Sequence, residues 1–293
     1  ADTVSAPSFN LDAEKSLSLA NVTSPTSWTD LVSGNINLTV ASGTTRSNEG
    51  NGSIAVSAGV QNGTSNGAYL APVAVGTPSN PSGDMTLMMW IKPTSWNATW
   101  NIFASRWFNG FAGGGTSVDT DYHFAIKING AAHNLNLYTT SKSDVFGSYD
   151  FALNKWYLVG FTLTSTGNLQ FYVNGQKDGS LVSGANHTAS SSSYLFVGDV
   201  RNRANCWECS MNGYIGKFRI WNSVLTTTQV ANDYKNEAAA LGYSTTTTLS
   251  LATSPKYRIA NTITATVPSA GKVSFFERGK IIPKCKNVTA AST

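Results

Sequence analysis

The sequence predicts an all-β protein whose main domain is a sandwich of two sheets. First, apolar side chains occupy both faces of residues 157–163 at period two, so both faces of this strand are expected to be covered. Second, turns follow at residues 165–168 and at Asn174-Gly175, a pair that tolerates the positive φ of a tight hairpin. Third, charged residues make up only 12% of the 293-residue chain, which is typical of extracellular and virion β proteins.

Further strands are expected where apolar residues alternate or cluster between turn residues. They are residues 9–13, 36–40, 53–56, 69–73, 85–92, 102–107, 122–129, 134–138, 169–173, 194–199 and 214–221. We expect another turn at residues 177–179. A short helix is expected at residues 226–237, with Thr226 as its N-cap and with Val230 and Tyr234 on one face. Residues 235–243 are expected to form a linker.

Three segments resemble laminin-G-like domains of the concanavalin-like jelly-roll superfamily. The segments are residues 85–93 (MTLMMWIKP), 155–175 (KWYLVGFTLTSTGNLQFYVNG) and 214–225 (YIGKFRIWNSVL). They follow one another in the order that the family shows. The resemblance implies a jelly-roll β-sandwich over residues 1–240, with residues 1–35 as an N-terminal lead-in, and it says little about the ligand.

Residues 27–35 (SWTDLVSGN) resemble a segment that precedes laminin-G-like domains in many phage and bacterial structural proteins, and they are one residue longer than that pattern. Trp28 and Leu31 are expected to pack under the sandwich while residues 33–35 form a turn. Asp30 is interpreted as the residue that caps this turn. The alternative is that Asp30 holds a cation.

Residues 241–293 are predicted to form a partial immunoglobulin-like domain. Their expected strands are residues 246–251, 261–267, 272–277 and 280–282, and they resemble the first half of bacterial and phage immunoglobulin-like repeats. Half a sandwich leaves a row of unpaired strand groups and an exposed apolar face. We therefore expect that a continuation of the chain or another subunit completes this sheet.

Charge and hydropathy argue against nucleic-acid and membrane partners. The net charge is +4, and the basic residues are scattered without the stacking aromatics that nucleic-acid binding requires. No apolar run approaches the roughly 18 residues of a spanning helix, and the first residues show no signal-peptide pattern. The expected partners are other virion proteins, copies of the same chain and a cell-surface glycan.

Sugar binding is the commonest activity of the lectin-like proteins that the chain resembles. Aromatic side chains in loops are the candidates for it. We select Trp96, Trp100, Trp107 and Trp207 as ligand-binding residues, because indole rings stack on sugars and neighbouring amides bond hydroxyls. Trp90, Trp156 and Trp221 are expected in the core instead.

Calcium is the metal that the resemblance implies. Asp199 lies near a position where relatives place calcium ligands, although Arg201 and Arg203 disfavour a cation there. Cys206 and Cys209 form a CxxC pair, but a closed zinc site of four thiolates is impossible with 3 Cys. A local disulfide or two reduced thiols are the alternatives.

Catalytic patterns are weak. Glycoside hydrolysis needs two carboxylates facing a cleft, and only Asp119 and Asp121, which share a strand face, or Glu208 are candidates. No Gly-x-Ser-x-Gly elbow occurs, and the three histidines, His123, His133 and His187, lie in ordinary strand or loop contexts. We therefore expect no enzymatic activity.

The sequence thus predicts a non-enzymatic structural and adhesion module on a virion surface, as part of a bacteriophage fibre, tail or head decoration. The alternative is a secreted or cell-surface bacterial lectin. An enzyme is the third hypothesis, and it would require activity on a polysaccharide that is lost when Asp121 or Glu208 is changed.

Overall fold

The chain divides into two compact units, Ala1–Tyr234 and Lys235–Thr293. In a computed structural model, the described residues of the first are 6–57, 67–98, 100–107, 122–198 and 210–234. Those of the second are 235–238, 248–251, 263–266, 271–273, 276–277, 280–281 and 288–290.

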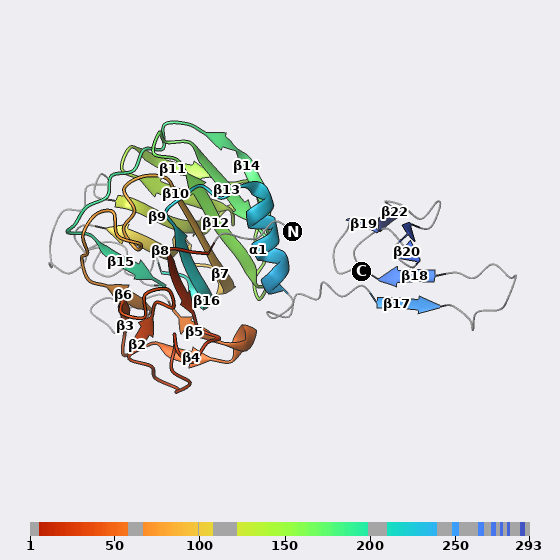
Figure 1. The fold of residues 1–293 in the computed structure, drawn as a ribbon, viewed down its shortest axis with the longest axis horizontal. Coiled ribbons are helices and arrows are strands. Elements are labelled where there is room, and N and C mark those ends of the chain that lie inside the picture. Colours follow the sequence, from red (N-terminus) through yellow and green to blue (C-terminus); the bar gives the residue numbers. More distant parts are fainter. Residues whose placement is uncertain are drawn as a thin grey trace, which may run out of the picture. The chain divides into compact units, whose positions relative to one another are not determined.

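Two antiparallel sheets form the larger unit (Figure 1). Sheet one has the order β14-β13-β12-β7-β16-β5-β4, and β1 also pairs with β16. Its strands are β1 (Phe9–Asp12), β4 (Thr45–Ser47), β5 (Ser53–Val56), β7 (Met85–Ser95), β12 (Tyr157–Leu163), β13 (Leu169–Val173), β14 (Gln176–Val182) and β16 (Asn212–Trp221). The short 3₁₀ helix η1 (Glu49–Asn51) precedes β5.

Sheet two has the order β11-β10-β9-β8-β15-β6-β3-β2. Its strands are β2 (Ser27–Thr29), β3 (Asn37–Val40), β6 (Ala68–Leu70), β8 (Trp100–Trp107), β9 (Tyr122–Asn129), β10 (Leu135–Thr139), β11 (Lys142–Phe146) and β15 (Tyr194–Val197). Together the two sheets confirm the predicted all-β fold with two antiparallel sheets.

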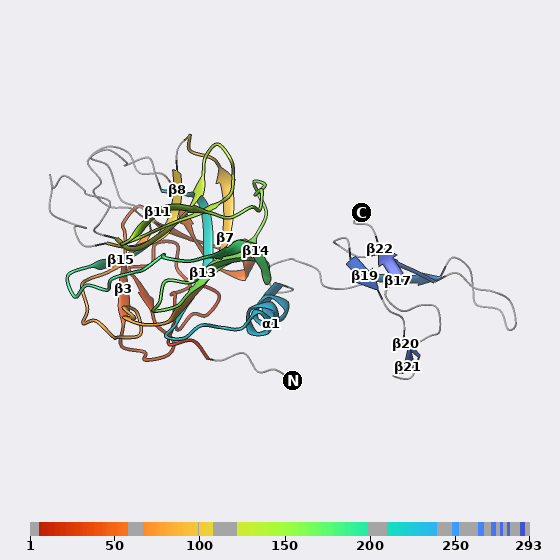
Figure 2. The same ribbon diagram turned by 90° about the horizontal axis from the view of Figure 1, so that it is seen from above.

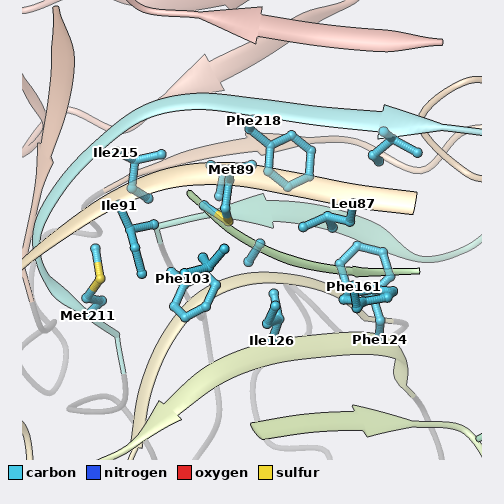
Figure 3. Packing of buried hydrophobic residues seen from close by; sticks show 14 of the residues in the cluster. Leu87, Met89, Ile91, Phe103, Phe124, Ile126, Phe161, Met211, Ile215 and Phe218 are labelled. Atoms are coloured by element: carbon cyan, nitrogen blue, oxygen red, sulfur yellow. The ribbon is translucent and has the colours of Figure 1, made fainter. Parts of the chain in front are cut away.

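The core lies between the inner faces of the sheets. Figure 3 shows Leu87, Met89 and Ile91 of β7 facing Phe103 of β8 and Ile126 of β9. Because successive strand residues point to opposite faces, the alternate residues of these strands point away from the core. These alternate residues form the outer faces of the two sheets, and the two outer faces are covered differently.

Every residue of β12 is buried, as its two apolar faces predicted. One face packs in the core, but the other is covered by a helix rather than by a second sheet. Trp90, directly opposite Leu158 of β12, stacks on Tyr234 of helix α1 (Thr227–Ala238) with ring centroids 5.7 Å apart. Figure 1 places α1 beside β12 and β13, and Figure 2 shows it near β13 and β14. Trp90, Trp156 and Trp221 are buried as expected, although none of them belongs to the cluster between the sheets.

Local turn and cap chemistry agrees with the sequence at two places. Asn174 and Gly175 have φ of 50° and 77°, the left-handed values of a tight hairpin, which here joins β13 to β14. Helix α1 begins with a capping box: the Gln229 amide donates to Thr226 Oγ1, and the Thr226 amide donates to Gln229 Oε1.

Two predictions are wrong. The expected turn at residues 177–179 lies inside β14, where a register shift against β13 accommodates Gly179 (φ 69°) as a bulge. The expected linker begins too early, because α1 continues to Ala238. Val230 and Ala238 are both fully buried, so the apolar stripe of the helix extends into that segment.

Asp30 caps its turn, as the sequence predicted. Its Oδ1 accepts the amides of Asn10 and Val32, and its Oδ2 accepts the amide and the hydroxyl of Ser33. These bonds use both carboxylate oxygens, which favours the structural role over a cation site. Trp28 beside it is fully buried, and Leu31 is partly buried.

In the second unit the described segments form three antiparallel pairs. They are β17 (Thr248–Leu251) with β18 (Ile263–Thr266), β19 (Gly271–Val273) with β22 (Val288–Ala290), and β20 (Phe276–Glu277) with β21 (Lys280–Ile281). The immunoglobulin-like assignment stays a prediction. No helix among the described residues of either unit is long and apolar enough to cross a membrane.

Candidate ligand-binding face

The outer face of sheet two carries polar side chains where β8, β9, β10 and β11 lie side by side. Phe124, Ile126 and Ile128 of β9 point into the core. Lys127, which alternates with them, therefore points outward, and its neighbour across the ladder is Asn136 of β10. An outward lysine in a strand is ordinary, but this one is buried: its side chain is only 2% exposed.

Two aromatic rings and one carboxylate surround the Lys127 ammonium. Its Nζ lies 3.5 Å from the ring centroid of Trp100 and 3.6 Å from that of Tyr138. Trp100 and Tyr138 meet edge to face, with centroids 6.5 Å apart. Asp144 Oδ1 lies 3.8 Å from the same Nζ. Ring faces attract a cation by roughly 2 kcal/mol when water is excluded, so the rings and the carboxylate together hold a charge that burial disfavours.

Asp144 is aimed at this lysine by the backbone. The pairing of β10 with β11 shifts register between Leu137 and Thr139, and Asp144 has φ of 54°. Asp is among the residues that adopt such a left-handed value most readily. The Asn136 amide donates to Asp144 Oδ1 (3.0 Å), and the Tyr138 hydroxyl donates to Asp144 Oδ2 (3.1 Å). A bulge of this kind re-aims a side chain, as it does beside many functional sites.

We call Trp100, Lys127, Asn136, Tyr138 and Asp144 the outer-face cluster. Its surface is open in part: Trp100 and Tyr138 are half-buried, and the Asp144 side chain is 38% exposed. Phe146, opposite Asn136 on β11, is 46% exposed and extends the aromatic surface. Asn136 Oδ1 is buried and has no hydrogen-bond partner. The ring surfaces can pack on C–H groups of a ligand, and the neighbouring carboxylate and amide can hydrogen-bond to its hydroxyls.

Trp96, another predicted ligand residue, has different partners. Its ring stacks on His133 with centroids 4.9 Å apart and planes 17° from parallel, and it packs against the core. His133 Nδ1 lies 3.7 Å from Asp150 Oδ1, whose side chain is largely exposed. Trp96 therefore uses one ring face and part of its edge within the protein, which leaves it less surface for a ligand than the prediction assumed.

The remaining predicted site residues fall outside what the structure describes. Trp107 lies in β8, but only its backbone is described. Trp207, Asp199, Cys206 and Cys209 lie outside the described residues, and so do the candidate hydrolase acids, which are Asp119, Asp121 and Glu208. Among the residues that are described, no three His, Cys, Asp or Glu side chains gather closely enough to hold a metal ion.

Sequence reasoning missed Lys127, Asn136, Tyr138 and Asp144. One indication was present: Lys127 alternates with the apolar residues Ile126 and Ile128 of its strand, and Asn136 and Tyr138 occupy alternate positions of the next. The convergence on Asp144 was not visible, because it depends on a register shift that no sequence pattern marked.

Comparisons with known proteins now add to this geometry. The family model described as the concanavalin A-like lectin/glucanases superfamily (Laminin_G_3) matches residues 62–231. The chain belongs to this superfamily. The match spans β6 to the first part of α1 and includes the whole outer-face cluster. No curated protein matches the sequence.

Two kinds of solved structure share the superfamily's fold with this chain. The binding domain of botulinum neurotoxin serotype G superposes with a TM-score of 0.55 at 14% identity, over 80% of this chain and 52% of that domain. Trypanosoma rangeli sialidase superposes with a TM-score of 0.52 at 14% identity, over 79% of this chain and 32% of the enzyme. The chain thus spans about half of one and a third of the other, and at this identity the likeness shows the fold alone.

Proposed function

We propose that this chain is a non-enzymatic carbohydrate-binding module and that the outer-face cluster contacts the glycan. The observation that carries the proposal is the pair of partly exposed rings, Trp100 and Tyr138, beside the exposed carboxylate of Asp144. Sugars present C–H faces that pack on rings and hydroxyls that donate to carboxylates. Membership of a superfamily named for lectins and glucanases supports the same class of ligand.

Substitution of Trp100 tests this proposal. We expect Trp100→Ala to weaken binding about tenfold or more, since an aromatic contact contributes roughly 0.5–1.5 kcal/mol beyond the area it buries. A glycan array identifies the ligand, and calorimetry then compares the wild type, Trp100→Ala and Leu181→Ala. Leu181 is exposed on β14 of sheet one and serves as the control. Equal affinity of all three proteins would contradict the assignment of this face.

The non-enzymatic part of the proposal has its own assay. A glycosidase needs two carboxyl groups about 5–10 Å apart. Asp144 lies on the described face, whereas Asp119, Asp121 and Glu208 lie outside the described residues. We expect no new reducing ends when the protein is incubated with a panel of polysaccharides. If the wild type releases reducing ends and Asp121→Asn or Glu208→Gln does not, the proposed function changes from binding to hydrolysis.

We further propose that the module is displayed on a virion, where it assembles with other virion proteins or with copies of itself. The resemblance of residues 27–35 to the lead-in of phage structural proteins supports this location. The secreted or cell-surface lectin remains the second candidate. Native mass spectrometry of the protein from its source distinguishes them, since a stoichiometric particle complex supports the virion and a free 31.1 kDa chain supports secretion.

Calcium at Asp199 is a separate proposal. We expect calcium, and not magnesium, to raise the melting temperature, and we expect Asp199→Asn to abolish that rise. An identical melting temperature with calcium and with a chelator would remove the metal from this account.

A further inference from the structure

Two of the three histidines, the buried His123 and the partly buried His187, form a pair at one end of sheet two. His123 Nε2 lies 2.6 Å from His187 Nδ1, with ring centroids 4.7 Å apart and ring planes 18° from parallel. His123 is on β9 and is 1% exposed. His187 belongs to residues 183–193, which connect β14 of sheet one to β15 of sheet two. We call residues 183–193 the strap.

The hydrogen bonds fix where the protons of this pair lie. His187 Nε2 contacts the carbonyl oxygen of Gly83 at 3.0 Å, and a carbonyl only accepts, so this nitrogen carries a hydrogen. In the neutral ring Nδ1 of His187 is then an acceptor, and His123 Nε2 must donate to it. His123 Nδ1 is consequently without a hydrogen, and this buried atom has no partner.

Burial and neighbouring cationic groups make protonation unfavourable at His123. Burial, then His187, then Arg106 of β8 hold the pKa of His123 well below its ordinary value. Burial also lowers the pKa of His187, against the opposing effects of the Gly83 carbonyl and Asp84. Arg106 is fully buried, and burial lowers its pKa to about 9, so it still carries its charge at neutral pH.

Each way of adding a proton costs the closed pair something. A proton on His187 Nδ1 places two N–H groups opposite each other and removes the acceptor. A proton on His123 Nδ1 leaves a buried N–H without an acceptor, in a ring that the positive charge of Arg106 already disfavours as a cation. Water would solvate both protonated rings if His187 moved away. Acid therefore favours separation of the pair.

The strap has few apolar contacts. Ala185 is its one fully buried apolar side chain, and hydrogen bonds hold the rest of it. Near its far end, Asn80 Nδ2 donates to the carbonyl of Ser190, and Arg106 Nη1 donates to that of Ser193. Polar bonds hold the central part, among them the bond of His187 to the Gly83 carbonyl and that of the Ala185 amide to the Gly167 carbonyl (2.9 Å). Segments with few buried apolar contacts open most easily.

The strap is also bonded to the hairpin that carries part of the outer-face cluster. The Thr188 amide donates to Thr140 Oγ1 (2.9 Å), Ser141 Oγ donates to the carbonyl of Asn186 (3.0 Å), and Lys142 Nζ donates to that of Ser183 (2.9 Å). Thr140 and Ser141 connect β10, which carries Tyr138, to β11, which begins at Lys142 and carries Asp144.

We propose that mild acid separates His123 from His187, releases the strap, and thereby loosens the β10–β11 hairpin so that ligand binding weakens. The last step rests on the proposed function, whereas release of the strap does not.

Hydrogen–deuterium exchange of the full chain tests the release directly. We expect residues 183–193 to be protected at about pH 7.5 and to lose protection at about pH 5, after correction for intrinsic exchange. Each proton taken up shifts the opening equilibrium by about tenfold per pH unit. Peptides from β12 serve as the internal reference. Unchanged protection of the strap in the wild type would overturn the proposal without any variant.

Variants and a binding arm complete the test. The double variant His123→Gln/His187→Gln keeps amide donors but cannot titrate, so its strap exchange should not respond to pH. The third histidine provides the control, because His133→Gln should keep the wild-type response. The glycan is selected at about pH 7.5. When the pH is lowered to about 5, the affinity of the wild type for this glycan should fall, and the affinity of the double variant should not. If acid releases the strap but the protein binds no glycan at either pH, the proposed function is contradicted. The release of the strap by acid is still supported in that case.

Discussion

The outer faces of the two sheets are both partly covered, but by different chemistry. Sheet one is covered by α1, through the Trp90–Tyr234 stack and the Arg219–Asp233 ion pair at 3.4 Å. Sheet two carries a buried lysine with its carboxylate and amide at a partly open surface. The first face is completed within the chain, whereas the second presents rings and acceptors to an external group. The fact that a residue is buried does not identify a binding site. The chemical nature of the buried group, here a charged amine, is what points to one.

Energetics sharpen the contrast. Covering Trp90 removes apolar surface from water and stabilises the fold. Burying the Lys127 ammonium costs free energy that the two rings and Asp144 must offset, and an apolar residue there would avoid that cost. If the outer face of sheet two only had to be shielded from water, apolar side chains would be enough and this cluster would not be required. The cost supports a role for the cluster in binding.

The largest expected effect tests the covered face. Trp90→Ala should lower the free energy of unfolding by about 3–5 kcal/mol, because it removes a fully buried indole and leaves a cavity under α1. Urea unfolding followed by circular dichroism measures this change. A loss below about 1 kcal/mol would mean that α1 does not form an essential cover.

The histidine pair predicts an acid-sensitive stability. Both folded-state pKa values lie below the ordinary value, so the unfolded chain binds more protons below about pH 6.5. Stability is therefore retained above that pH and falls as the pH decreases toward the folded-state values, by at most about 2 kcal/mol for each histidine at pH 5. Unfolding across this range should show the decline, and the His123→Gln/His187→Gln variant should reduce it. An equal decline in the variant would assign it to other groups.

Thr226→Ala weakens the cover of sheet one without touching the sheet. Loss of the capping box should cost about 1 kcal/mol, as N-cap substitutions typically do. The melting temperature reports this loss, and Ser223→Ala, one turn earlier in the chain, is a control. Glycan affinity of Thr226→Ala should equal that of the wild type, because α1 covers the other sheet.

The smallest effect tests the candidate face. Tyr138→Phe keeps the ring over Lys127 and removes the hydroxyl that donates to Asp144, so stability should fall by about 0.5–1 kcal/mol. Chemical denaturation measures it. Glycan affinity should fall less than it does in Trp100→Ala. A larger loss of affinity than in Trp100→Ala would make the hydroxyl, rather than the ring surface, the main contact.

Period-two patterns were enough to predict most strands of the larger unit, because burial of one or both faces leaves a direct trace in sequence. The trace in β12 predicted two covered faces, but it could not distinguish a sheet from a helix as the second cover. Gly179 resembled a turn residue because positive φ serves bulges and turns alike. Of the outer-face cluster, only Trp100 was among the residues selected from the sequence. Lys127, Tyr138 and Asp144 meet through strand register, which adjacent residues do not encode.

Nuclear magnetic resonance of the indole N–H groups during a glycan titration tests the central claim most directly. Of the 8 Trp, Trp100 lies on the candidate face and Trp90 under α1, so one spectrum compares the two outer faces. We predict that the Trp100 signal shifts with the glycan concentration while the Trp90 signal stays in place. A glycan that binds and shifts Trp90 but not Trp100 would contradict the account.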